Sequence, residues 1–251
     1  MLKVVVIGSG NVAQHLITVF GKSSTIHLVQ VYARNVDVLA HLVPKEKITD
    51  DFNTLEEADI YIISITDGSI PEVSALLPFS GKLVVHTSGS VALEQINNKN
   101  RRGVFYPLQT FSKNKAIDFK QVPLCLESEK EADYTILETL AQSISNSVYN
   151  INSQQRKSLH VAAVFVSNFA NYMYSIGYDI CEQNNVPFDI LKPLIQETAE
   201  KVQTLSPKQA QTGPARRNDI TTMEKHLAFL TDEKIKTIYT LLSQSIQNNN
   251  E

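Results

Sequence analysis

The segment from Gly8 to Ala13 has the spacing of a loop that cradles phosphates. It reads Gly-Ser-Gly-Asn-Val-Ala and directly follows the apolar run Leu2–Ile7, at the start of an amphipathic pattern. Gly8 permits a tight turn, Gly10 lets the backbone approach a pyrophosphate, and the following helix N-terminus supplies N–H donors. This pattern predicts a dinucleotide site, with a ligand-free βα turn as the alternative. The expected contacts are Gly8, Ser9, Gly10, Asn11 and Val12.

The end of the second predicted strand, His27–Tyr32, indicates which dinucleotide binds. NAD enzymes place Asp or Glu there to accept from the ribose 2′-hydroxyl, whereas arginine suits the 2′-phosphate of NADP. Here Arg34 and Asn35 follow the strand, and no acid occurs before Asp37, which fits the first turn of the next helix. We therefore expect NADP(H) at Arg34 and Asn35. The alternative is that Arg34 is a solvated loop residue.

Small hydroxyl residues follow two further predicted strands. Open α/β sheets bind ligands outside the carboxyl ends of their strands, so these residues are expected to approach the pyrophosphate and the nicotinamide ribose. Ordinary turn chemistry explains the same residue types and stays open as an alternative. The residues are Ser64 and Thr66, with Ile65 between them, at the end of one strand, and Thr87 and Ser88 after the next.

A long helical stretch, Ser153–Gln183, carries a polar stripe that could do acid–base chemistry. Reduction of a carbonyl or imine needs a group that protonates the heteroatom, and an imidazole with a pKa near 6.5 suits that task. His160 is the preferred acid and Lys157 the alternative, while a solvated helix face would look the same. The stripe comprises Lys157, His160, Val164, Asn168, Asn171 and Ser175, and the opposite, core-facing side comprises Leu159, Ala163, Val166, Ala170 and Met173.

Other polar residues could contact a substrate. Ser88 and Gln109 are expected as secondary donors, and Asn168 and Asn171 as residues that orient the substrate. Arg216 and Arg217 follow a Gly-Pro turn and could hold a carboxylate or phosphate, although a solvated basic pair is an equal interpretation.

Composition excludes several other classes. The net charge of −3 over 251 residues, with a pI near 6.1, lacks the basic excess of a nucleic-acid surface. The six histidines show no H-x-x-x-H or Cys–His spacing, so no metal site is expected. Two cysteines cannot form a multi-disulfide framework, and the first apolar run is far shorter than the roughly 20 residues of a membrane helix. Without a leader pattern, a cytoplasmic protein that contacts no membrane is expected.

The chain changes character near residue 152. Short apolar runs alternate with helical stretches up to that point, which predicts a doubly wound, mostly parallel α/β sheet over 1–152. Long helical patterns then predict an all-helical domain over 153–251. The expected strands are Leu2–Ile7, His27–Tyr32, Ile60–Ile65, Leu83–His86, Gly103–Tyr106, Val122–Leu126 and Val148–Ile151, and the expected later helices are Phe188–Leu205, Thr221–Leu230 and one after Thr231.

Several motifs together resemble a known group of NADP oxidoreductases, in which a Rossmann domain precedes a helical domain of unknown function. The matching motifs are Gly8–Ala13, His86–Gly89 (HTSG), Pro107–Phe111 (PLQTF), His160–Asn168 (HVAAVFVSN) and Thr212–Asp219 (TGPARRND). The group is related to pyrroline-5-carboxylate reductase, ketopantoate reductase and the β-hydroxyacid dehydrogenases. The resemblance implies an NADP-dependent oxidoreductase with a helical domain like the C-terminal domain of 6-phosphogluconate dehydrogenase. This chain departs from the group at Tyr106, where relatives usually carry histidine.

We expect a small 2-oxo acid, β-hydroxy acid or cyclic imine substrate, with a non-catalytic NADP-binding sensor or scaffold as the alternative. A homodimer through the helical domain is also expected. The run Val161–Val166 is apolar around most of the helix, and a domain of about 100 residues offers limited core to bury it. A twofold partner would complete the burial.

The first testable prediction concerns cofactor preference. The protein should bind NADPH more tightly than NADH by one to two decades, because a charge-assisted phosphate contact contributes roughly 1.5–3 kcal/mol. Calorimetric titration of both cofactors checks this, and Arg34→Ala should remove most of the difference. Equal affinities in the wild type would contradict the assignment of Arg34.

Overall fold

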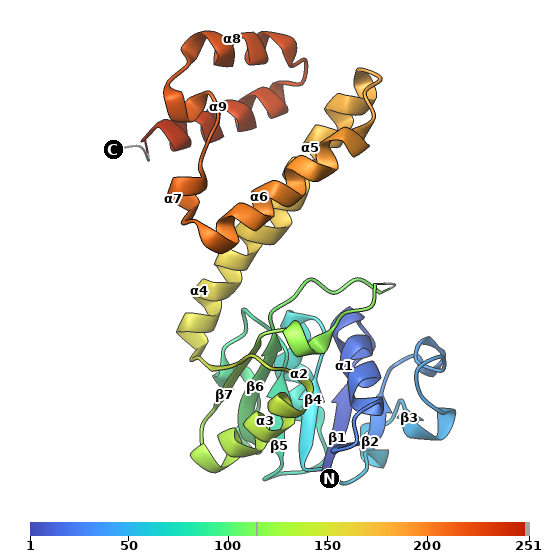
Figure 1. Cartoon of the computed structure of the whole chain (residues 1–251). Helices are drawn as coiled ribbons and strands as arrows, with labels where there is room; N and C mark the ends of the chain where they lie inside the picture. Colours follow the sequence, from blue (N-terminus) through green and yellow to red (C-terminus); the bar gives the residue numbers. More distant parts are fainter. Residues whose placement is uncertain (114, 249–251) are drawn as a thin grey trace. The chain divides into compact units, whose positions relative to one another are not determined.

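Alternating apolar strands and helices build an eight-stranded sheet in the first part of the chain (Figure 1). The computed structural model describes residues 1–113 and 115–248, and the chain divides into two units, Met1–Ser167 and Asn168–Glu251. The strand order is β3-β2-β1-β4-β5-β6-β7-β8, and every neighbouring pair is parallel except β6 and β7. The strands are β1 (Leu2–Ile7), β2 (Ile26–Tyr32), β3 (Ile48–Thr49), β4 (Ile60–Ile63), β5 (Leu83–His86), β6 (Arg101–Pro107), β7 (Leu124–Ser128) and β8 (Val148–Asn150).

Helices bury both faces of this sheet, which explains why its central strands are almost continuously apolar. Alternate residues of β1 point to opposite faces. Val4 and Val6 pack with α1 (Asn11–Gly21) and α3 (Glu131–Ile144), whereas Val5 and Ile7 pack with α2 (Ile70–Leu76). The doubly wound, mostly parallel sheet predicted from the sequence is confirmed.

Strand boundaries differ from the sequence pattern where pairing, rather than residue type, decides them. The two-residue strand β3 was not predicted, because its length carries no periodicity. The predicted strand Val122–Leu126 begins two residues late and continues to Ser128, because antiparallel pairing with β6 extends to Gly103. The run Ile60–Ile65 stops being a strand at Ile63.

The long helix predicted over 153–183 is confirmed, with a change of helix type inside it. It consists of α4 (Ser153–Ala163), a π-helical stretch (Val164–Phe169) and α5 (Ala170–Gln183). A π-helical turn holds an extra residue, so side chains beyond it change face relative to a regular helix. The expectation that Val166 is a core residue is wrong, since this residue, within the π-helical stretch, is 77% exposed.

Over the part of the second unit that the structure describes, the regular elements are helices, as predicted. The two units divide after Ser167, within the π-helical stretch, whereas the sequence pattern changes at residue 152. None of the helices in the described ranges combines the length and apolarity needed to cross a bilayer. After α5, the α-helices of the second unit in the described residues are α6 (Lys192–Thr204), α7 (Pro207–Ala210), α8 (Ile220–Phe229) and α9 (Glu233–Asn248).

Large apolar side chains on the second unit lead to a prediction about association. Leu194, Phe229 and Leu241 are each at least 60% exposed, and burying such groups against a partner is favourable. We propose that exposed apolar side chains of this unit pack against a second copy of the chain. Light scattering at micromolar concentration should give about twice the 28.0 kDa chain mass. Leu241→Lys should lower that mass and Glu46→Lys, in the first unit, should not; a wild-type mass of one chain would contradict the proposal.

Candidate functional site

The carboxyl ends of the central strands border a cleft of about 780 Å³, here called the candidate cleft. It lies within the first unit. Most of the cofactor residues expected from the sequence line it together, and so do Tyr32, Phe52, Asp67, Tyr106 and Phe111, which were not proposed as site residues. The expected residues found there are Gly8, Ser9, Gly10, Asn11, Val12, Arg34, Ser64, Ile65, Thr66, Thr87, Ser88, Gln109 and His160.

The glycine loop between β1 and α1 has the geometry of a pyrophosphate cradle. Gly8 has φ +137°, and a Cβ there would lie 2.0 Å from the Ser64 carbonyl oxygen, so only glycine fits. Gly10, in contrast, faces open space within 4 Å of where its Cβ would be. No side chain caps the N-terminus of α1, which leaves its first N–H groups available to an anion. Gln14 steadies the loop by donating its amide to the Ser9 carbonyl oxygen at 2.8 Å.

The cleft wall beyond β2 carries Arg34 and an aromatic pair. The rings of Tyr32 and Phe52 stack with centroids 4.0 Å apart, and both residues line the cleft with Arg34. Asn35 has a different task, because its side chain accepts from the Asp37 N–H at 3.1 Å and caps the 3-10 turn Val36–Val38. Asp37 lies in the first turn of that 3-10 helix, as predicted.

At the ends of β4 and β5, hydroxyl groups bond to one another. Thr87 Oγ1 donates to Ser64 Oγ at 3.1 Å and thereby ties the two strand ends together. Ser88 Oγ accepts from the N–H groups of Ser90 (3.1 Å) and Val91 (3.0 Å). The Ser88 oxygen thus serves the turn, and its hydroxyl lies 3.4 Å from the oxygen of Ser90, whose own proton goes to Asp67.

Tyr106 and His160 form a hydrogen-bonded pair in the cleft. Tyr106 lies on β6, His160 on α4, and the phenol oxygen is 3.1 Å from His160 Nδ1. Gly89 makes the room for them, because a Cβ at that position would lie 2.6 Å from His160 Nδ1 and 2.8 Å from the phenol oxygen. The half-buried His160 imidazole therefore lies against the turn that follows β5.

Burial decides the protonation of this phenol. It raises the pKa of Tyr106 to about 12, and the neighbouring Cys125, its partner in the β6–β7 ladder, acts in the same direction. Burial likewise raises the pKa of the Cys125 thiol to about 11. Tyr106 is therefore a neutral phenol at physiological pH and can donate its proton to Nδ1 of a neutral His160. That arrangement places the proton of the neutral imidazole on Nε2.

A buried ion pair fixes the helix that carries His160. Arg156, one turn before His160 and 1% exposed, pairs with Glu127 on β7 and donates to the Val91 carbonyl oxygen at 2.6 Å. Ser153 completes the network, because its N–H and hydroxyl both donate to Glu127, at 2.8 Å and at 2.9–3.1 Å. The first turn of α4 is thereby held to both β7 and the segment after β5.

The buried His86 imidazole is kept neutral. Burial lowers its pKa to about 4, and the positive charge of Arg156 contributes in the same direction. The ring accepts a hydrogen bond from the Ser88 N–H at its Nδ1 atom, 3.2 Å away. Among the described residues, no partner bonds its Nε2 atom. His86 thus shapes the turn at Ser88 without titrating near neutral pH.

Some residues expected at the site do not line the cleft. Lys157 is exposed and lies outside its lining, as does Asn35. Asn168, Asn171, Arg216 and Arg217 belong to the second unit. Conversely, the sequence pattern did not predict that Arg156 supports the site. Its spacing of four from His160 places both on one helix face, but no local signal pointed to Glu127, 29 residues away.

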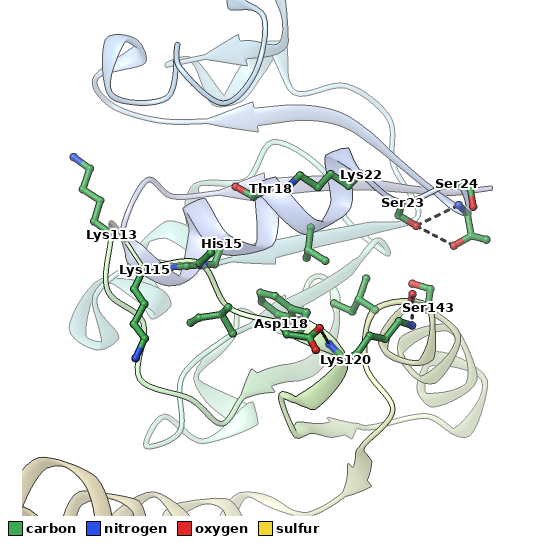
Figure 2. Close-up of a pocket in the computed structure, with 16 residues that line it drawn as sticks. His15, Thr18, Lys22, Ser23, Ser24, Lys113, Lys115, Asp118, Lys120 and Ser143 are labelled. Carbon is green, nitrogen blue, oxygen red and sulfur yellow. Dashed lines mark hydrogen bonds between the residues drawn. The ribbon is translucent and has the colours of Figure 1, made fainter. Parts of the chain in front are cut away.

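A second hollow of similar size lies along α1 (Figure 2). Its lysines are exposed, and in Figure 2 Lys113 and Lys115 extend away from His15 rather than converging on it. His15 instead supports the loop after β6, with Nε2 3.0 Å from the Ser112 carbonyl oxygen and its ring 5.1 Å from Phe111. Through these contacts His15 helps to position the PLQTF segment, of which Pro107, Gln109 and Phe111 line the candidate cleft.

Comparisons with known proteins agree with this geometry. Residues 3–89 match the family described as NADP oxidoreductase, coenzyme F420-dependent, and residues 122–246 match the domain of unknown function DUF2520. The crystal structure of BF3122 from Bacteroides fragilis, described as a putative NADP oxidoreductase, is 40% identical over 98% of both chains, with a TM-score of 0.88.

More distant structures share the fold. Pyrroline carboxylate reductase of Plasmodium falciparum, with NADP bound, is 12% identical over 100% of this chain and 98% of its own (TM-score 0.64). A reductive aminase of Aspergillus terreus, in complex with NADPH and ethyl levulinate, is 14% identical over 100% and 95% (TM-score 0.70). No curated protein matches the chain.

The state of His86 makes a prediction about acid stability. Its pKa is about 4 in the folded chain and near 6.5 when unfolded, so the unfolded chain alone binds this proton between those values. The resulting loss of unfolding free energy begins as pH falls below about 6.5 and reaches about 3 kcal/mol near pH 4. Urea unfolding from pH 7 to 4 should therefore show a shallower pH dependence in His86→Asn, whose amide oxygen can still accept from Ser88.

The control for this measurement is His27→Asn, which removes an exposed imidazole on β2. Identical pH profiles for His86→Asn and wild type would show that His86 does not resist protonation in the folded chain.

Proposed function

Since the chain belongs to the family of NADP oxidoreductases that join an F420-dependent-type NADP oxidoreductase domain to DUF2520, we propose that it uses NADPH to reduce a small imine or carbonyl compound. The observation that carries this proposal is the Tyr106–His160 pair, a proton-donating constellation in the same cleft as the pyrophosphate cradle. Distant relatives named for pyrroline carboxylate, imine reduction and reductive amination support the substrate class.

The candidate cleft fits the cofactor at three points. The Gly8–Val12 loop and the uncapped N-terminus of α1 would hold the pyrophosphate. Arg34 would bind the 2′-phosphate beside the Tyr32–Phe52 stack, and Thr66 and Thr87 would approach the nicotinamide ribose. When bound, NADPH would supply the hydride. The residues of this chain then have to bind the acceptor, orient it and provide the proton.

His160 is the proposed proton donor. Its Nδ1 bonds to Tyr106, so its Nε2 is the nitrogen that can serve a substrate heteroatom. Protonated His160 would give a proton to an imine nitrogen or carbonyl oxygen as that atom gains electron density. The imidazole that remains keeps its proton on Nδ1, and the oxygen of Tyr106, a phenol held neutral by burial, accepts from that N–H. Gln109 and the Ser88 hydroxyl are further candidates for holding the substrate.

Replacing the proposed donor tests the assignment. His160→Ala should lower turnover by roughly 10²–10⁴, the usual contribution of a general acid, and should leave NADPH affinity nearly unchanged. Tyr106→Phe should lower turnover about 2- to 12-fold, because it removes one hydrogen bond to the imidazole. NADPH oxidation against cyclic imines, aldehydes and 2-oxo acids is the measurement, with cofactor affinity followed by fluorescence titration.

Lys157→Ala is the matched control, because Lys157 lies one turn from His160 but outside the cleft lining. Loss of turnover in Lys157→Ala alone would transfer the acid role to the lysine. Tight NADPH binding without turnover on any compound would favour the alternative, a non-catalytic NADP-binding sensor or scaffold.

A further inference from the structure

Asp67 places a carboxylate in the candidate cleft close to the Tyr106–His160 pair. It follows β4, and the Ser90 hydroxyl donates to its Oδ2 atom. Ser90 is the neighbour of Gly89, the residue against which His160 Nδ1 lies. Among the described residues, no hydrogen-bond partner is found for Asp67 Oδ1, although the residue lines the cleft. This oxygen is therefore available to a donor on a ligand.

No fixed cation balances this carboxylate at the same end of the cleft. The charged side chains in the described lining, apart from His160, are Arg34, Asp67 and Glu72. Arg34 follows β2, and the strand order places β2 two positions from β4, the strand that Asp67 follows. At about 4.8 Å per strand, roughly 10 Å separate the ends of these two strands. The proposed 2′-phosphate would occupy that guanidinium in any case.

We propose that the substrate binds at this end with a positive charge, as a protonated imine or an amine-bearing carbonyl compound, and that Asp67 selects it over carboxylate-bearing analogues. This inference rests on the proposed function and narrows its substrate class. A carboxylate bound here would face Asp67, and the arginine in the described lining, Arg34, follows β2 and would be occupied by the 2′-phosphate. A cation would gain an ionic partner whose charge is partly shielded from bulk water by the cleft.

The same arrangement suits the proposed proton donor. When His160 protonates an imine nitrogen, a bond from imidazole nitrogen to hydrogen breaks, a bond from imine nitrogen to hydrogen forms, and the positive charge moves to the substrate. Asp67 stabilises the charge in its new position. A carbonyl oxygen, in contrast, gains no positive charge that a carboxylate would favour unless the substrate also carries an amine.

A binding experiment tests the charge preference without any reaction. Two unreactive probes of the same ring size, cyclopentylammonium and cyclopentanecarboxylate, are titrated calorimetrically into the full chain saturated with NADP⁺. We expect the cation to bind at least tenfold more tightly at low salt. Asp67→Asn, which keeps an oxygen for Ser90, should reduce the cation's affinity at least fivefold, whereas Glu46→Gln, an exposed acid outside the cleft, should not.

A kinetic experiment applies the same comparison to turnover. The ratio of kcat/KM for 1-pyrroline to that for 1-pyrroline-5-carboxylate should exceed ten and should fall toward one in Asp67→Asn. If neither imine is reduced but the cation binds in an Asp67-dependent way, the proposed function fails and the charge preference stands. Tighter binding of the carboxylate probe, no binding of either probe, or unchanged ratios in Asp67→Asn would overturn the proposal.

Discussion

The arrangement of the site depends on the buried ion pair between Arg156 and Glu127. It joins the first turn of α4 to β7, while the second guanidinium nitrogen reaches the Val91 carbonyl oxygen. A buried pair contributes little net stability when complete, but removing one partner typically costs about 3–5 kcal/mol because the other charge is left unpaired. In this protein the ion pair fixes the position of the start of α4. With Arg156 fixed, the helical repeat places His160 one turn later against Gly89 and Tyr106.

Steric fit and burial then define what this pair of side chains can do. Gly89 leaves the space that a methyl group would take from His160 and Tyr106. The register of β6 against β7 places Tyr106 beside Cys125, in an environment where the phenol stays neutral. A neutral phenol donates a hydrogen bond without adding charge. Tyr106 is therefore a group whose protonation does not change near neutral pH.

The two ends of the candidate cleft differ in the charge that they present to a ligand. The helix N-terminus and Arg34 make the dinucleotide end positive, which suits phosphates. Near the other end, Arg156 is neutralised by Glu127 and His86 is kept uncharged by burial. Asp67 is then the carboxylate that the proposed cationic substrate would meet in the cleft that His160 also lines. The ion pair therefore serves the electrostatics of the site as well as its geometry.

Local sequence was sufficient for the features that depend on neighbouring residues. The Gly8–Ala13 spacing predicted the cradle, the apolar runs predicted the parallel sheet, and the 3.6-residue period predicted the long helix with His160 on its polar stripe, because each arises from short-range backbone geometry. Tertiary structure alone paired Tyr106 with His160 and Arg156 with Glu127, which lie 54 and 29 residues apart. Only the structure also showed that Val166 is exposed and that it lies in a π-helical stretch, which the residue pattern did not predict. Contacts at such separations, and the burial that shifts a pKa, depend on how strands and helices pack, and no local period encodes that packing.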